Sequence, residues 1–272
     1  MMFLTSIVSV ILLLMPNAAL ASPLSARLAA GGGNGVLKKA GPAICIRNDT
    51  ITEDALFESK STNWAGAVVS SARDSVTAVQ GSFTVPKPIL PPRGNSNDQY
   101  CGAAWVGIDG DTCTSSLIQT GVFWCIHHGI VTYEAWYEYI PAASIAYSGI
   151  SVGAGDVITV AVTRNGFNGG VATLENTSSG QSASHTFTSD RDGNLCGQDA
   201  EWIVEDFSSN GGLVPFANFG TITFTEATAV VNGETVSPGS SNADNLYIDF
   251  GTGRQTTTTF SGGEVTVGFE ER

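Results

Sequence analysis

The stretch Ala200-Glu201-Trp202-Ile203-Val204-Glu205-Asp206-Phe207 predicts one β-strand with two chemically mixed faces. Successive side chains of a strand point to opposite sides of the sheet. One side therefore carries Glu201, Ile203, Glu205 and Phe207. The other side carries Trp202, Val204 and Asp206. Each side sets a carboxylate among apolar neighbours, where burial raises a carboxyl pKa and suits the group to proton transfer at low pH.

The same alternation recurs from residue 64 onward, interrupted by turn residues at intervals of about ten, and predicts an all-β fold. The predicted strands are residues 64–69, 76–85, 103–108, 116–124, 131–139, 157–163, 170–175, 200–207, 221–231 and 265–269. The proline-rich residues 86–92 and residues 208–212 are predicted loops. Because no break in composition divides these strands, we expect one β-sandwich of two large antiparallel sheets, of the jelly-roll or concanavalin type.

The composition of the 272 residues excludes several classes of protein. Only 14% of the residues are charged and 42% are hydrophobic, which argues against a disordered chain. The net charge is −13, so we expect no nucleic-acid partner, because binding would require basic groups to neutralise phosphates. Residues 1–60 carry a net charge of +1 and residues 61–272 carry −14. Such an acidic body is typical of an extracellular protein that works in acid.

The N-terminus is predicted to be a targeting segment. The apolar run from Ile7 to Met15 is too short to span a bilayer, and Ala19-Leu20-Ala21 matches a signal-peptide cleavage site. We therefore expect a signal peptide over residues 1–21, secretion, and no association with a membrane. Residues 22–60 contain four basic residues ahead of Lys60 and differ in composition from residues 61–272. They are predicted to be a propeptide, with residues 61–272 as the functional domain.

Five cysteines would enter an oxidising compartment. Cys45 lies in the predicted propeptide. The other four, Cys101, Cys113, Cys125 and Cys196, allow three disulfide pairings, and their positions do not choose among them. A zinc site is not indicated, because the sequence contains no C-x-x-C spacing.

Most catalytic motifs are absent or lack their structural context. Residues 149–153 match G-x-S-x-G, but a nucleophile elbow requires a strand-to-helix turn in an α/β fold. The carboxylates Glu134 and Glu138 share one strand face with an aromatic residue, Trp136. This arrangement leaves open a jelly-roll glycoside hydrolase with paired carboxylates, or a carbohydrate-binding module without catalysis.

Six segments in the same order resemble the glutamic peptidase (eqolisin) family of secreted acid endopeptidases. They are residues 61–67 (STNWAGA), 105–113 (WVGIDGDTC), 117–121 (LIQTG), 135–139 (AWYEY), 172–176 (ATLEN) and 200–207 (AEWIVEDF). The resemblance implies a two-sheet sandwich and a pepstatin-insensitive endopeptidase. Its catalytic Gln and Glu fall on Gln119 and Glu205. Glu205 would deprotonate a water, and the Gln119 amide would stabilise the oxyanion, without a metal or other cofactor.

The resemblance implies further roles and partners. The resemblance implies that the residues that bind the substrate are Trp64, Trp105, Asp109, Glu138 and Phe207. It implies a Cys113–Cys196 disulfide, which would leave Cys101 and Cys125 to pair. It also implies polypeptide substrates and inhibition by the chain's own basic propeptide, and we expect the enzyme to be a monomer.

Overall fold

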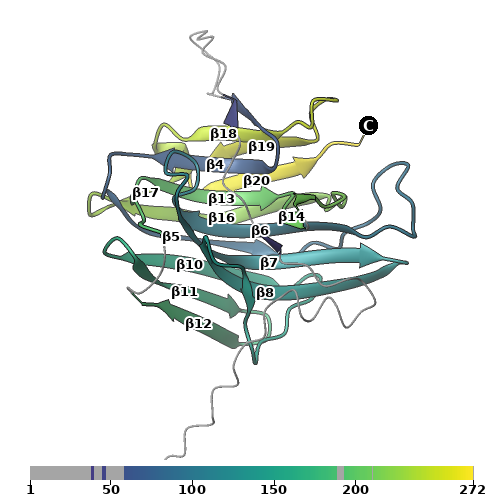
Figure 1. Ribbon diagram of the computed structural model, residues 1–272, viewed down its shortest axis with the longest axis horizontal. Coiled ribbons are helices and arrows are strands. Elements are labelled where there is room, and N and C mark those ends of the chain that lie inside the picture. The colour runs from purple at the N-terminus through teal and green to yellow at the C-terminus, as the bar shows by residue number, and fades with distance from the viewer. Residues whose placement is uncertain (1–37, 40–44, 47–57, 189–192, 210, 272) are drawn as a thin grey trace, which may run out of the picture.

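The computed structural model describes residues 38–39, 45–46, 58–188, 193–209 and 211–271. The predicted signal peptide lies outside these residues, as does most of the predicted propeptide. Two large sheets make up most of the described chain (Figure 1). Among the described residues the only helical turn is a short 3-10 turn at Pro238–Ser240, and no helix is long and apolar enough to cross a membrane.

The first large sheet has nine strands in the order β2-β3-β18-β4-β13-β6-β7-β8-β9. Their bounds are β2 (Cys45–Ile46), β3 (Glu58–Ser61), β18 (Asp244–Ile248), β4 (Trp64–Ser70), β13 (Asp199–Glu205), β6 (Tyr100–Ile108), β7 (Leu117–His127), β8 (Ile130–Ile140) and β9 (Ile145–Ala146). Neighbouring strands are antiparallel except β3 and β18, which pair in parallel. We call this the catalytic sheet, because it carries Gln119 and Glu205, the catalytic residues expected from the sequence.

The second large sheet follows the order β12-β11-β10-β5-β16-β20-β19, with β17 paired to β16. Its strands are β12 (Gln181–Phe187), β11 (Gly169–Asn176), β10 (Val157–Asn165), β5 (Val76–Thr84), β16 (Thr221–Val231), β20 (Glu264–Phe269), β19 (Thr256–Ser261) and β17 (Glu234–Val236). A third, small sheet consists of β1 (Lys38–Lys39), β14 (Ser208–Ser209) and β15 (Gly212–Leu213).

The main core fills the space between the two large sheets. Trp202 points from β13 toward the second sheet, where its indole Nε1 donates to the carbonyl of Gln80 at 2.7 Å. Val204 on the same strand and Phe224 on the second sheet belong to the same buried cluster. The expected sandwich of two large sheets is therefore confirmed.

The opposite face of the catalytic sheet, which we call the outer face, holds a second buried cluster. It contains Trp64, Val68, Trp105, Leu117, Phe123, Trp136, Ile203 and Phe207 among others. Alternation along β13 puts Ile203 and Glu205 on this outer face and Trp202 on the core face, as the sequence predicts. Because both faces of β13 pack in buried clusters, the strand is buried throughout, including its carboxylates.

All ten predicted strands occur with small shifts of their ends. The alternation did not predict β12 or β19, whose sequences QSASHTF and TTTTFS are dominated by polar residues. Both strands lie at sheet edges, where one side needs little apolar surface. The loop expected at 208–212 contains the short strands β14 and β15 instead.

Candidate active site

Gln119 and Glu205 come from two strands that flank β6, and both face the outer side of the catalytic sheet. Gln119 on β7 pairs with Gly107 of β6. Glu205 at the end of β13 pairs with Ala103, four residues away on the same strand. The indole of Trp105, which lies between these two positions of β6, connects them. A Cβ atom added at Gly107 would lie 3.0 Å from Trp105 Cζ3 and 3.2 Å from Gln119 Cβ.

The carboxylate of Glu205 is held by two side-chain donors. Trp105 Nε1 donates to Oε2 at 2.8 Å, and Asn63 Nδ2 donates to Oε1 at 3.5 Å. All three side chains are buried in the full chain. Hydrogen bonds from neutral donors stabilise the ionised form of a carboxylate, so this environment supports Glu205 as a base.

The amide of Gln119 is oriented by Glu138 on the adjacent strand β8. Gln119 Nε2 donates to Glu138 Oε2 at 2.8 Å, which distinguishes the nitrogen from the oxygen of this amide. The second hydrogen of Nε2 is not used in that bond. Gln119 Oε1 is buried without a hydrogen-bond partner among the described residues. Both groups are therefore available to a substrate or a water.

Aromatic rings surround these polar groups. Trp64 and Trp105 meet edge to face with centroids 4.8 Å apart. Phe207 contacts Phe123 at 4.7 Å, and Phe123 stacks on Trp136 at 4.4 Å. These rings lower the local polarity around the carboxylates, which strengthens electrostatic interactions within the site.

Two other carboxyl groups of the strand are held neutral at acid pH. Asp206 follows Glu205 but points to the opposite face. Burial first and the charge of Glu205 second raise the pKa of Asp206 to about 9. Burial also raises the pKa of Glu201 well above its ordinary value, with further contributions from Asp199, Asp109 and Asp111.

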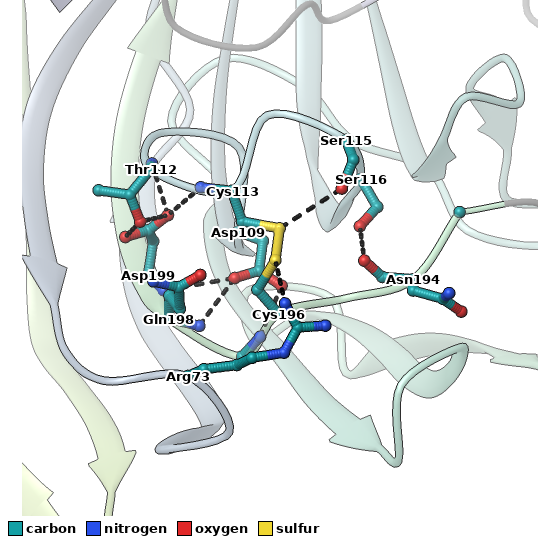
Figure 2. The surroundings of a disulfide bond; sticks show 12 residues. Arg73, Asp109, Thr112, Cys113, Ser115, Ser116, Asn194, Cys196, Gln198 and Asp199 are labelled. Atoms are coloured by element: carbon teal, nitrogen blue, oxygen red, sulfur yellow. Dashed lines mark hydrogen bonds between the residues drawn. A yellow bond between two sulfur atoms is a disulfide. The ribbon is translucent and has the colours of Figure 1, made fainter.

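Asp109 fastens the entry to β13. Its carboxylate accepts hydrogen bonds from the backbone N–H groups of Gly197 and Gln198, both at 2.8 Å. In the other direction, Asp199 accepts from the backbone N–H of Thr112 at 2.8 Å. Figure 2 shows this exchange beside a disulfide bond. Asp109 was expected near the substrate, and the structure places its carboxylate against the backbone before β13.

Both disulfides expected from the resemblance are present. Cys113 and Cys196 join the loop after β6 to the segment before β13 (Figure 2). Cys101 and Cys125 form the other bond and are paired residues of β6 and β7. Together they fasten β6 to the strands that carry Gln119 and Glu205.

Of the expected site residues, Trp105 is hydrogen-bonded to Glu205 and Gln119 to Glu138, and both pairs lie on the outer face. Trp64 and Phe207 contribute rings to the same face. Asn63 was not predicted as a partner of Glu205, although its Nδ2 is the second donor to that carboxylate. The available signal was its position directly before Trp64, in a segment that resembles the family.

The alternative sites are not supported by the geometry. Glu134 and Glu138 are four residues apart on β8, which separates their Cα atoms by about 13 Å, and the Glu138 carboxylate is hydrogen-bonded to Gln119. Ser151 of the G-x-S-x-G match lies in the segment between β9 and β10, with no helix after it. The described residues contain no cluster of His, Cys, Asp or Glu suited to a metal ion.

Comparison with known proteins gives one consistent family. The profile of the peptidase A4 family matches residues 62–269. Aspergillopepsin-2 of Aspergillus niger is 43% identical over 224 residues, which cover 77% of this chain and 78% of that protein. Scytalidopepsin B of Scytalidium lignicola is 37% identical over 238 residues, which cover 81% of this chain and 86% of that protein.

Solved structures agree with the sequence comparison. Scytalido-glutamic peptidase with a transition-state analog inhibitor matches with a TM-score of 0.69 and 36% identity, over 77% of this chain and 98% of that chain. Aspergilloglutamic peptidase from Aspergillus niger matches with a TM-score of 0.60 and 45% identity, over 63% of this chain and 99% of that chain.

Proposed function

The chain belongs to the peptidase A4 family and is a glutamic-type acid endopeptidase, and from this premise we propose that Gln119 and Glu205 are its catalytic pair. The observation that carries the proposal is that the two side chains lie on one face of one sheet and each is held by its own hydrogen-bond partner. Trp105 holds the carboxylate, and Glu138 holds the amide.

In the proposed reaction, the Glu205 carboxylate takes a proton from a water molecule, and the water oxygen attacks the carbonyl carbon of the scissile peptide bond. The carbonyl oxygen becomes negative and accepts a hydrogen bond from the free hydrogen of Gln119 Nε2. Protonated Glu205 then gives its proton to the leaving nitrogen, and the C–N bond breaks. The chain's own residues supply every proton transfer in this scheme.

Site-directed variants test the pair. We expect Glu205→Gln and Gln119→Ala to fold and to lose activity on denatured haemoglobin at about pH 3. Loss of one oxyanion donor costs about 10²- to 10³-fold in kcat, and loss of the base should cost at least as much. Glu175→Gln, which removes an exposed carboxylate of β11, is the matched control. Full activity in either site variant with unchanged thermal unfolding would refute the assignment. Pepstatin should leave the wild type active.

The division of the precursor is also a proposal: a signal peptide over 1–21, a propeptide over 22–60 and the mature enzyme over 61–272, secreted from the cell. The profile match that starts at residue 62 supports this division. Strand β3 belongs to the catalytic sheet through its pairing with β18. This pairing supports a mature start at β3, between Glu58 and Thr62.

Inhibition by the propeptide has two supports. The backbone of Lys38–Lys39 pairs with Ser208–Ser209 of β14, which begins three residues after Glu205. Gln119 and Glu205 are both inaccessible to solvent in the full chain. A segment bound next to Glu205 would exclude a polypeptide substrate until it is cut. We propose that the mature enzyme acts as a monomer.

A further inference from the structure

Glu201 is a second carboxyl group on the strand that carries Glu205, and the proposed reaction does not use it. It lies two residues before Ile203 on the outer face of β13. Its cross-strand neighbours are Val68 of β4 and Gly107 of β6. The side chain is completely buried.

Neither carboxyl oxygen of Glu201 has a hydrogen-bond partner among the described residues. The contrast with the two nearest carboxylates is sharp. Asp199 accepts from Thr112, Cys113 and Ser70. Asp109 accepts from backbone N–H groups before β13. The local donors are therefore directed at Asp199 and Asp109 and leave Glu201 without a hydrogen bond.

The charged groups that act on Glu201 are all acidic. Asp199 comes from its own strand, and Asp109 and Asp111 come from the end of β6 and the loop after it. The paired residues on the two adjacent strands, Val68 and Gly107, carry no charge. Burial and these three negative charges both oppose ionisation of Glu201, so the fold accommodates this residue as a neutral acid.

We propose that Glu201 is an acid-dependent latch of the catalytic sheet: the sheet closes around its neutral carboxyl group and opens when that group ionises. An ionised Glu201 would need water, and water can reach it only if the packing over the outer face of β13 opens. The same strand holds Glu205, and Ile203 between the two glutamates packs in the aromatic cluster of the site. Opening at Glu201 therefore disassembles the active site.

The raised pKa of Glu201 makes the folded state less stable as the pH rises. The pKa of Glu201 in the folded protein is raised well above its ordinary value of 4.5. The folded state therefore binds a proton that the unfolded state releases. The stabilisation is fully present below about pH 4.5 and is lost as the pH rises toward the folded pKa, by up to about tenfold in the folding equilibrium per pH unit.

The test compares Glu201→Gln with wild type by denaturant unfolding at intervals from pH 3 to pH 7. Glutamine has the size of the neutral acid and does not ionise. We expect equal stability at pH 3 and a flatter decline in the variant, up to about 100-fold in the folding equilibrium by pH 6.5. After incubation at pH 6.5, the variant should also recover more activity at pH 3. The control is Glu175→Gln, which should follow the wild type.

Parallel stability curves for wild type and Glu201→Gln would overturn the proposal. If Glu201→Gln does not fold at pH 3, Glu201→Met removes the same ionisable group with a side chain of similar length. Proton release on unfolding of the wild type at pH 6 is an independent measurement. Asp206 also releases a proton on unfolding, so we expect the wild type to release about one proton more than Glu201→Gln, and equal release from the two proteins would also overturn the proposal. The readout is unfolding, so the result does not depend on whether Gln119 and Glu205 are the catalytic pair.

Discussion

Glu205 and Asp206 are adjacent in the chain but belong to opposite faces of the catalytic sheet. The donors Trp105 and Asn63 reach Glu205, whereas Asp206 Oδ1 is buried without a partner among the described residues. Two neighbouring carboxyl groups thus have opposite environments. Glu205 accepts hydrogen bonds from two side-chain donors, whereas burial favours the neutral form of Asp206.

This difference predicts the effect of Asp206→Asn on the pH–rate profile. The pKa of Asp206 is about 9, so its side chain is neutral throughout the acid working range, as asparagine is. We expect the acid limb of kcat/KM and the value of kcat at about pH 3 to stay within about twofold of wild type. An acid limb displaced to lower pH would contradict the prediction, because it would mean that a negative charge on Asp206 normally raises the pKa of Glu205. Asp98→Asn, at an exposed position, is the control.

At the scale of elements, the close approach of β6 and β7 places Trp105 between the two proposed catalytic residues. Gly121 of β7 pairs with Trp105 of β6 and leaves room for the indole. A Cβ atom at this glycine would lie 2.1 Å from the carbonyl oxygen of Ala104 and 2.5 Å from Trp105 Cβ. A side chain at position 121 would therefore push against the backbone of β6 at Ala104 and Trp105, and the residue that carries the indole would have to move.

Gly121→Ala tests this packing. We expect a loss of about 1–3 kcal/mol in the free energy of unfolding, because overpacking forces side chains and backbone to shift. Activity should fall as well, since Trp105 would be displaced from Glu205. Thermal unfolding and kcat at acid pH measure the two effects. The control is Gly153→Ala, where a Cβ atom would meet nothing nearer than 3.9 Å. Wild-type stability in Gly121→Ala would show that the strands can separate without cost.

For the whole molecule, charge distinguishes the segment that contains the proposed propeptide from the proposed mature enzyme. The net charge is +1 over residues 1–60 and −14 over residues 61–272. In acid, many exposed carboxylates of the enzyme become neutral, which relieves self-repulsion and weakens the attraction of a basic propeptide. The same change of pH would therefore release the propeptide and favour the fold.

The isolated peptide 22–60 should inhibit the mature enzyme, and its inhibition constant should rise with salt because added ions screen the attraction. The measurement is the inhibition constant at low and high ionic strength at one acid pH. A peptide with Lys38 and Lys39 replaced by glutamine should inhibit more weakly and respond less to salt. Inhibition that is independent of salt would assign the binding to backbone pairing at β14 alone.

The fold was accessible from local patterns, and the proposed catalytic pair from the resemblance to a family. Alternation along residues 200–207 and the other strands predicted the sandwich, because a strand buried on at least one face repeats its apolar residues with a period of two. The motifs LIQTG and AEWIVEDF located Gln119 and Glu205. Polar edge strands such as β19 were not predicted, because they are stabilised by pairing with a neighbouring strand and their sequences show no apolar alternation.

Cross-strand relations required the tertiary structure. The sequence does not show that Trp105 and Asn63 donate hydrogen bonds to Glu205. Nor does it show that Glu138 orients the amide of Gln119. Nor does it distinguish Asp109, satisfied by backbone N–H groups, from Glu201, which has no hydrogen-bond partner among the described residues. The reason is physical. Residue type and alternation are properties of one strand, whereas the protonation state and orientation of a side chain depend on the neighbours that sheet register places around it.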